Sequence, residues 1–311
     1  MPPATGPVNP LVRAVGEVPL VIGAGLDLHA LRIRVPEAMA LDPSAARAGL
    51  AAGQRARNAI TWIGHASLLV RVGGINVLTD PVFSPRPFSN VLGPRRLVPL
   101  PIDVEDLPDI AAIVISHADY DHLDLPSLRR LAARFPRAVV VLPPRNGDLA
   151  RRAGFADVRE LAWYETTRVG GLTIEGLPAL HDSRREPGNP RRRGWSGFGL
   201  EAGGRRVFFA GDTGYGDTFA EIRRLSGRFD IALVPIGAYE PRAVVRDVHA
   251  DPEEAARIAR DVGARLAIGM HWGTFGLEPT PPSQARDRFR AAGGSGLTTR
   301  TLKIGETLIL R

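Results

Sequence analysis

One stretch of the sequence, residues 113–124, constrains both the fold and the chemistry of this chain. It opens with the apolar β-branched run 113–115 and then supplies five metal-type donors within eight residues: His117, Asp119, Asp121, His122 and Asp124. The next residues, 125–134, predict a helix with Pro126 in its first turn. The donors therefore lie between a buried strand and a helix, which is the edge of an α/β sheet where ligands bind.

The side chains of this loop predict a metal site. Imidazole nitrogens and carboxylate oxygens are the donors that hold zinc, iron or manganese. Alternate residues of an extended loop face the same way, so His117, Asp119 and Asp121 can converge, while His122 faces a second ion. The alternative is a solvated acidic turn in which His122 caps the following helix. The density of donors, with no Lys or Arg among them, favours the metal site.

Three further apolar runs end in the same kind of donor. His181 follows the run at 172–177, Asp212 follows 206–210, and His271 follows 266–270. Each donor precedes a turn or loop, as His117 does. We therefore expect distant segments of the chain to meet at one site and to enclose a pair of cations.

The order of predicted elements favours one α/β domain. Residues 1–57 are rich in Pro, Ala, Gly and Arg, and we interpret them as an extension that wraps the domain and contains a helix at 44–57. Residues 58–311 alternate strand-rich stretches with helices and contain no linker, which predicts two sheets faced by helices. The expected helices are 126–135, 146–153, 218–226, 251–262 and 283–292, and the expected strands include 59–63, 67–72, 75–79, 195–200, 299–303 and 306–310.

Composition narrows the classes of function. The chain contains no Cys, which excludes disulfides, a thiolate nucleophile and Cys-ligated metals. Its formal net charge of +7 is carried almost wholly by Arg, since Lys303 is the only lysine. This balance favours anionic substrates or membrane headgroups, although the codon bias of a GC-rich genome explains it equally well. No basic strand is interleaved with aromatic residues, so we expect no nucleic-acid partner.

The apolar runs predict the compartment. None approaches the roughly 20 residues that a membrane helix needs, so we expect no stable membrane insertion. We predict a cytoplasmic protein that can associate peripherally with a membrane if its substrate is a lipid.

The cluster at residues 184–193 contains five arginines and follows His181 closely, and it would hold a phosphate or a headgroup. The alternative is a solvated loop.

Several motifs together resemble the metallo-β-lactamase superfamily and, within it, the N-acylphosphatidylethanolamine phospholipase D-like branch. The superfamily motif is His-x-His-x-Asp-His, followed by a distant His, an Asp and a final His. The resemblance covers about residues 58–280. The motifs that carry it are Thr-Trp-Ile-Gly-His-Ala-Ser at 61–67, Leu-Thr-Asp-Pro-Val-Phe-Ser at 78–84, Gly-Asp-Thr-Gly-Tyr at 211–215, Pro-Ile-Gly-Ala-Tyr-Glu-Pro-Arg at 235–242, His-Ala-Asp-Pro-Glu-Glu at 249–254 and His-Trp-Gly-Thr-Phe at 271–275.

The resemblance implies a four-layered αβ/βα sandwich with two metal ions at one edge of the sheets. It assigns His117, position 119 and His181 to a first ion, and Asp121, His122 and His271 to a second, with Asp212 bridging them. A hydroxide held by the metals would be the nucleophile. The residues that we assign to catalysis are Asp121 and His249; His249 would contact the leaving group or a phosphate, or else contact only the following helix. His65 would orient a ligand carboxylate, and Asp124 would do the same or cap the helix at 126–135.

The chain departs from this pattern at Asp119, where the family has His. Asp is shorter than His, and a third carboxylate beside Asp121 and Asp212 makes the site more negative and a weaker Lewis acid. His117, Asp119 and His181 form a two-His, one-carboxylate set, which suits iron or manganese better than zinc. Three outcomes stay open: a zinc hydrolase, an iron or manganese site, and a first site that stays empty.

We therefore predict a dinuclear metal-dependent hydrolase that cleaves a phosphodiester or a related ester. The cofactors would be two divalent metal ions, with zinc first and iron or manganese as alternatives. The substrate would be an anionic small molecule or lipid. The alternative functions are a lactonase or amidase, a diiron or manganese redox enzyme on the same fold, and a non-catalytic binding protein.

Overall fold

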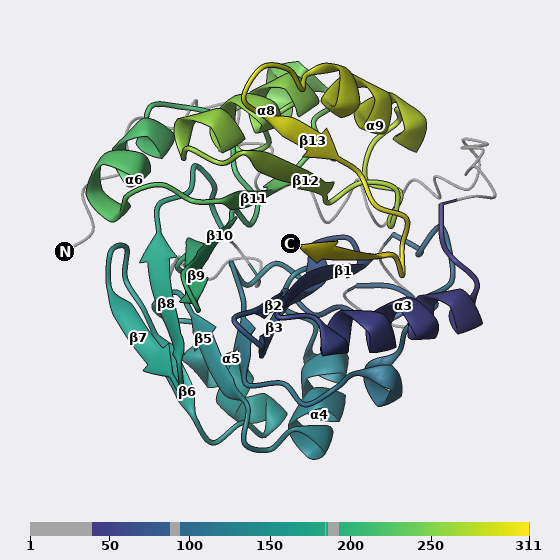
Figure 1. Cartoon of the computed structure of the whole chain (residues 1–311), viewed down its shortest axis with the longest axis vertical. Coiled ribbons are helices and arrows are strands. Elements are labelled where there is room, and N and C mark those ends of the chain that lie inside the picture. The colour runs from purple at the N-terminus through teal and green to yellow at the C-terminus, as the bar shows by residue number, and fades with distance from the viewer. Residues whose placement is uncertain (1–38, 88–93, 184, 186–192, 311) are drawn as a thin grey trace.

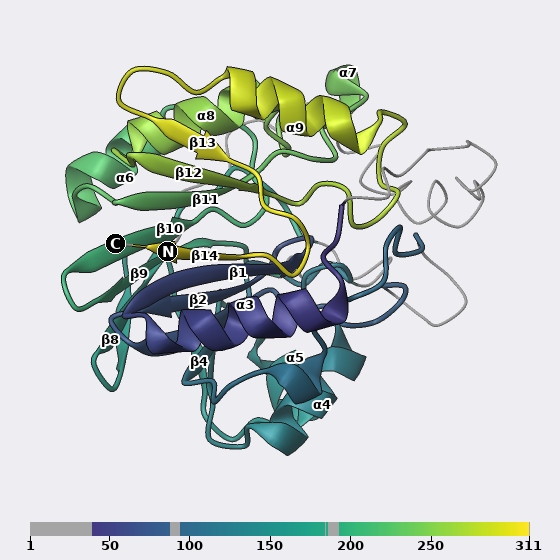
Figure 2. The same ribbon diagram turned by 45° about the vertical axis from the view of Figure 1, so that its right-hand side comes forward.

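Two mixed sheets pack face to face, with helices on both outer faces (Figure 1). The computed structural model describes residues 39–87, 94–183, 185 and 193–310. In both views one group of helices covers the first sheet and another group covers the second (Figure 2). The predicted four-layered sandwich is thus confirmed.

The first sheet combines an antiparallel half with a parallel half. Its strand order is β14-β1-β2-β3-β4-β5-β6. The pairs from β14 to β3 are antiparallel, whereas those from β3 to β6 are parallel. The strands are β1 (Asn58–Gly64), β2 (Ser67–Val72), β3 (Ile75–Thr79), β4 (Ala112–Val114), β5 (Val139–Leu142), β6 (Val158–Glu160) and β14 (Thr307–Leu310).

The second sheet repeats this plan. Its order is β13-β12-β11-β10-β9-β8-β7, with antiparallel pairs from β7 to β10 and parallel pairs from β10 to β13. Because parallel strands end at the same edge of a sheet, this half places several loops side by side. The strands are β7 (Thr166–Val169), β8 (Leu172–Leu177), β9 (Gly197–Ala202), β10 (Arg205–Phe209), β11 (Ile231–Pro235), β12 (Leu266–Met270) and β13 (Thr298–Arg300).

The helices begin close to where their capping residues predict. Asp124 and Asp251 cap their helices with side-chain oxygens, and proline follows each cap within the first turn. The helices over the first sheet are α3 (Pro43–Arg55), α4 (Leu125–Arg134) and α5 (Gly147–Ala153), with the short 3₁₀ helix η1 (Val104–Asp106). Those over the second are α6 (Thr218–Ser226), α8 (Pro252–Asp261) and α9 (Pro282–Ala291), and α7 (Arg242–Val245) is a single turn.

Two apolar cores hold the layers together. The larger core extends from between the sheets to beneath the helices of the second sheet and contains Trp62, Phe208 and Tyr239, all with no exposed side chain. The smaller core lies beneath the helices of the first sheet and contains Leu128 and Leu131. Full burial of one such side chain stabilises the fold by about 1.5–3 kcal/mol. These cores provide a rigid frame for the loops at the sheet edge.

Some element boundaries differ from the prediction. The helix predicted at 44–57 spans Pro43–Arg55, and the strand predicted at 195–200 is Gly197–Ala202. The strand predicted at 299–303 is only Thr298–Arg300, and the chain then crosses to pair β14 with β1. Helix α3 packs against β1 and β14, while residues 1–38 of the predicted extension, including His29, lie outside the described residues. Across the described ranges, no helix has the length and apolar character needed to span a membrane.

Candidate metal centre

The strand ends of both sheets bring the predicted donors together. The loops after β4, β8, β10 and β12 carry His117 to His122, His181, Asp212 and His271. Among the described residues, these side chains other than Asp119, together with His65, Asp80 and His249, form four groups of possible metal ligands, and within each group the donor atoms lie within 4.8 Å of one another. The groups are His65, Asp121, His122 and His271; Asp80, His117 and His122; His117, His181 and Asp212; and Asp212, His249 and His271.

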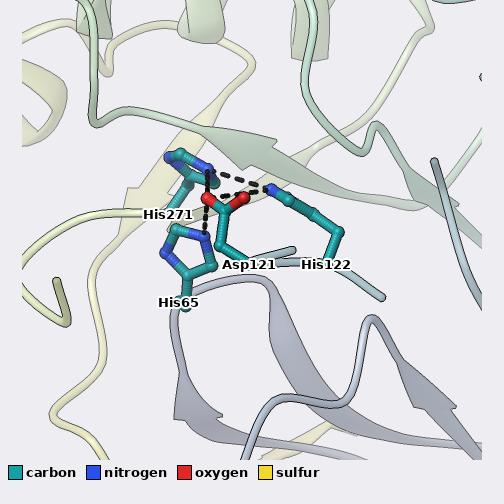
Figure 3. Close-up of side chains that lie close together, drawn as sticks. All are labelled: His65, Asp121, His122 and His271. Carbon is teal, nitrogen blue, oxygen red and sulfur yellow. Dashed lines mark hydrogen bonds and ion pairs between the residues drawn. The ribbon is translucent and has the colours of Figure 1, made fainter. Parts of the chain in front are cut away.

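The half of the centre that contains Asp121, His122 and His271 is closely packed (Figure 3). The Oδ2 atom of Asp212 lies 3.1 Å from His122 Nε2 and 3.0 Å from His271 Nε2. Asp121 Oδ2 lies 3.7 Å from His122 Nε2 and 3.9 Å from His271 Nε2. Four donors from three loops therefore face one small volume, which we call the second half-site.

Buried carboxylate and imidazole groups hold this half-site in place. The Nδ1 of His122 donates to Asp80 Oδ2 at 2.7 Å, and Asp80 also accepts from the backbone N–H of Ser116 at 2.7 Å and from its hydroxyl at 2.5 Å. The Nε2 of His65 donates to Asp121 Oδ2 at 3.0 Å, and the backbone carbonyl of His65 accepts from the N–H of His271 at 3.0 Å. Partners of this kind fix which imidazole nitrogen is free to bind a metal.

The other half of the centre, around His117, Asp119 and His181, is called here the first half-site. The Nδ1 of His117 donates to Ser116 Oγ at 2.9 Å, and the Nδ1 of His181 donates to the carbonyl of Val248 at 3.0 Å. Their rings lie 4.6 Å apart, centroid to centroid. Both imidazoles therefore present Nε2 towards the centre.

Asp119 is set apart from these imidazoles. Its Oδ2 lies 3.6 Å from His117 Nε2, its Oδ1 accepts from Ser183 Oγ at 3.3 Å, and its side chain is 36% exposed. It belongs to none of the four donor groups found in the described part of the chain. Burial raises the pKa of the Asp119 carboxyl, but the neighbouring imidazoles of His117 and His181 outweigh this and lower the pKa below its usual value, so Asp119 is a carboxylate at neutral pH.

Five buried atoms of the donor groups have no hydrogen-bond partner in the described part of the chain. Two are the Nδ1 atoms of His249 and His271, and the other three belong to a single donor group: His117 Nε2, His181 Nε2 and Asp212 Oδ1. Unpaired buried polar atoms are rare and costly, so each calls for an explanation. Two imidazole lone pairs and a carboxylate oxygen that face each other are a suitable ligand set for a divalent cation. The residues at this centre fit the metal ions that the sequence predicts.

Electrostatics also favours positive charge here. Burial lowers the pKa of His122, but the carboxylates of Asp212 and Asp121 outweigh it and raise the pKa well above its usual value. Conversely, burial raises the pKa of Asp212, while His122 and His271 lower it well below its usual value. A site that stabilises a proton between carboxylates in this way also attracts a metal cation.

His249 lies at the edge of the same cluster. Its Nδ1 is 3.9 Å from Asp212 Oδ2 and has no hydrogen-bond partner among the described residues. Its backbone carbonyl accepts from Arg242, which also pairs with Glu254 of α8. Its backbone is thus tied to the neighbouring helices, while its side chain faces the donor groups. Burial lowers the pKa of this imidazole to about 3, so it is neutral near pH 7.

The spacing argument for the loop was partly wrong. The N–H groups of His122 and Leu123 both donate to the carbonyl of Asp119, at 3.0 and 2.8 Å, so the chain turns here and is not extended. Asp121 therefore joins His122 in the second half-site and does not converge with His117. The carboxylate of Asp124 caps α4 by accepting a hydrogen bond from the backbone N–H of Ser127. Capping this helix was one of the two roles predicted for Asp124.

Sequence reasoning missed three residues that shape the centre. Asp80 was interpreted only as the end of a strand, although the motif at 78–84 contained it. Ser183 Oγ accepts from the N–H of Ala118 at 3.0 Å. Arg185 is only 6% exposed, donates to the carbonyls of Ala118 and Leu123 at 2.8 and 2.7 Å, and lies 4.1 Å from the ring of Tyr120.

The arginine cluster at 184–193 therefore has a structural role in the part that is described. The guanidinium of Arg185 braces the metal loop, and that of Arg193 pairs with Asp148 at 2.7 Å. Neither guanidinium is free for a phosphate, which was the expected role. Residues 184 and 186–192 lie outside the described residues.

Comparison with known proteins places this arrangement in a family. Residues 75–272 match the beta-lactamase superfamily domain. The chain is 39% identical over 231 residues to an N-acyl-phosphatidylethanolamine-hydrolyzing phospholipase D from Caenorhabditis elegans, a match that covers 71% of this chain and 65% of that protein. It is 32% identical over 258 residues to a UPF0173 metal-dependent hydrolase from Rubrobacter xylanophilus, covering 80% of this chain and 95% of that protein.

Solved structures agree on the fold. CmlA, a diiron β-hydroxylase from Streptomyces venezuelae, superposes with a TM-score of 0.63 at 22% identity, covering 82% of this chain and 54% of that one. The chain belongs to the beta-lactamase superfamily, as the sequence motifs predicted. Within that superfamily it is similar to relatives named as an N-acyl-phosphatidylethanolamine-hydrolyzing phospholipase D and as a metal-dependent hydrolase, and it spans just under two thirds of the length of the first of these.

Proposed function

We propose that this chain is a dinuclear phosphodiesterase that cleaves a phospholipid-type phosphodiester. The observation that carries the proposal is the convergence of imidazole and carboxylate donors from four strand ends on Asp212, with His117 Nε2, His181 Nε2 and Asp212 Oδ1 buried and without a partner among the described residues. The relative that is named as hydrolysing N-acyl-phosphatidylethanolamine, at 39% identity, supports a substrate of this class. That relative extends well beyond the matched region, so its substrate is adopted here as part of the proposal.

The residues that would hold the two ions divide as the half-sites do. His117, His181 and Asp119 would bind the first ion, Asp121, His122 and His271 the second, and Asp212 both. When bound, such ions act as Lewis acids towards a phosphoryl oxygen and lower the pKa of water, so that a nucleophile is available at neutral pH.

The chain's own groups would prepare and flank the reaction. Asp80, Ser116 and the carbonyl of Val248 keep the three imidazoles His122, His117 and His181 oriented with Nε2 inward. Neutral His249, at the rim beside Asp212, would donate a hydrogen bond to a substrate phosphate or leaving-group oxygen. Because the Asp119 side chain is 36% exposed and that of Asp121 only 22%, the substrate would approach over the first half-site.

The test begins with protein purified without added metal and then loaded with zinc. We expect hydrolysis of bis(p-nitrophenyl) phosphate, and release of an N-acylethanolamine from vesicles that contain N-acylphosphatidylethanolamine. Both activities should disappear on chelation and return with zinc. Absence of both activities in protein that holds two zinc ions per chain would overturn the proposal.

A second candidate is a redox enzyme with iron or manganese. The observation that favours it is Asp119, whose Oδ2 lies 3.6 Å from His117 Nε2. With His117 and His181 it offers a two-His, one-carboxylate set at the position where the superfamily motif has His. Iron at about two per chain in the purified protein, with a visible spectrum that changes on exposure to oxygen and no hydrolysis, would favour this alternative.

A further inference from the structure

A cavity of about 640 Å³ lies apart from the metal centre, where the edges of the two sheets meet. It is bounded by α9, by β13 and by the segment that leads from β13 to β14. Figure 2 shows this side of the molecule, with β13 and β14 at the edges of the two sheets. The volume is within the range of about 300–1,000 Å³ that is usual for small-molecule sites.

The inner wall of the cavity is apolar. Met39, Trp272 and Leu302 line it and are only 5%, 4% and 4% exposed. The indole N–H of Trp272 is buried and has no hydrogen-bond partner among the described residues. A buried donor without an acceptor is costly, so a ligand that supplies one acceptor atom here would be stabilised.

The rest of the lining is strongly basic. It contains Arg286, Arg290, Arg300 and Lys303 against a single carboxylate, Glu306. Arg286 pairs with its neighbour Asp287 at 2.8 Å, whereas the other three cations have no ion pair with any residue that the structure describes. The guanidinium of Arg290 donates only to neutral acceptors, the hydroxyl and carbonyl of Thr301. The lining therefore keeps a positive charge that a bound anion would neutralise.

We propose that this cavity binds an amphiphilic organic anion. The anionic head would lie at Arg290, Arg300 and Lys303, one of its oxygens would accept from the indole N–H of Trp272, and a short apolar chain would cover the indole ring and Leu302. A simple inorganic ion would leave the apolar wall without contacts, and a neutral apolar molecule would leave the cations unpaired. Only a ligand with both parts matches both walls.

Occupation of the cavity has a direct optical reporter. The ring of Trp272 stacks on that of Trp62 at 5.4 Å between centroids, and Trp272 directly follows the proposed ligand His271. A ligand in contact with Trp272 would change the fluorescence of this tryptophan pair. The proposal concerns a site apart from the metal centre and does not depend on the proposed activity.

The experiment titrates octyl sulfate, a weak ligand for metals, into the zinc-loaded full chain below its micellar concentration. Calorimetry and tryptophan fluorescence should both report one saturable site per chain. Inorganic sulfate tests the head alone and octyl glucoside tests the chain with a neutral head. We expect each of these to bind at least about tenfold more weakly than octyl sulfate.

Two variants distinguish the site from general basic charge. The double change R300Q with K303Q should weaken octyl sulfate about tenfold or more, since it removes two exposed cations of the lining. A matched change of two exposed arginines elsewhere, R129Q with R152Q, should leave binding unchanged. W272F, which keeps the ring and removes the N–H, should weaken binding by several fold while metal content stays the same. No saturable binding, or equal loss in both double variants, would overturn the proposal.

Discussion

The two half-sites of the metal centre differ in how completely the protein has built them. In the second half-site, His122 and His271 have side-chain exposures of 0% and 1%, and buried Asp80 and His65 hold the ligands from behind. In the first half-site, His117 is 1% exposed, but His181 is only half-buried and Asp119, which accepts a 3.3 Å hydrogen bond from Ser183, is 36% exposed. One half is thus preorganised and the other is open.

This difference indicates a division of labour. A rigid, shielded ligand set binds its ion tightly because its side chains lose little conformational freedom on binding. An open set with a carboxylate in place of His binds more weakly and leaves room for substrate. We therefore expect unequal metal affinities, with the second ion held more firmly than the first, and each prediction below probes that inequality.

The largest effect should come from removing a ligand of the second half-site. H271A should lose its second ion and nearly all activity, because that ion would keep only Asp121, His122 and the shared Asp212 as ligands. H181A should lose mainly the first ion. Metal analysis after dialysis checks this, and equal loss of both ions in each variant would contradict the inequality.

The next effect concerns the support of the second half-site. D80N keeps the shape of the side chain but removes the carboxylate that orients His122, so metal affinity at that half should fall about 10- to 100-fold. The matched change S183A, behind Asp119, should cost less than about tenfold. Competition with a metal-sensitive dye measures both, and a larger loss for S183A would show that the first half-site is the better built.

A smaller effect is expected when the difference at position 119 is reversed. D119H should raise zinc affinity at the first half-site about tenfold and should also raise the phosphodiesterase rate, because imidazole reaches further and suits zinc. D119N, which has the size of Asp without its charge, serves as the control. If D119H lowers both zinc occupancy and rate, Asp119 is a tuned ligand and the hydrolase proposal is weakened.

The last effect concerns the pH dependence of stability in the metal-free protein. Burial, followed by the charge of His271, lowers the pKa of His65 to about 3, whereas an unfolded chain has an imidazole pKa near 6.5. Between those values the unfolded state binds one more proton, so stability falls as pH falls, by about 1.4 kcal/mol per pH unit for this group.

The variant H65Q removes the imidazole that takes up a proton when the chain unfolds. Its unfolding free energy, measured by urea denaturation after chelation, should be lower than that of the wild type at pH 7 but should decline less steeply between pH 6.5 and pH 4. A slope equal to that of the wild type would show that His65 is not the group responsible.

Much of this architecture could be predicted from local sequence signals. Apolar runs followed by His or Asp located all four loops of the centre, and the Asp251-Pro pair marked the start of α8. The motifs indicated the family because they occur in a fixed order along the chain. Each of these signals lies within a short stretch of sequence, so it can be interpreted without knowing which distant residues it contacts.

Other features depend on contacts between distant residues. Nothing in the strand that ends at Asp80 indicates that this carboxylate would meet His122, 42 residues further on. The pairing of β14 with β1 joins the two ends of the domain, and no local pattern reports it. The prediction that His117, Asp119 and Asp121 face the same way assumed an extended loop. The chain instead turns at 119–123, because two backbone N–H groups donate to the carbonyl of Asp119, and this turn sets the direction of Asp121.

The most direct test of the account is a crystal of the zinc-loaded protein measured on both sides of the zinc absorption edge. The account predicts two anomalous peaks, one on each side of Asp212, with the peak beside His122 and His271 at the higher occupancy. A single peak elsewhere in the molecule, or a higher occupancy beside His117 and His181, would contradict it.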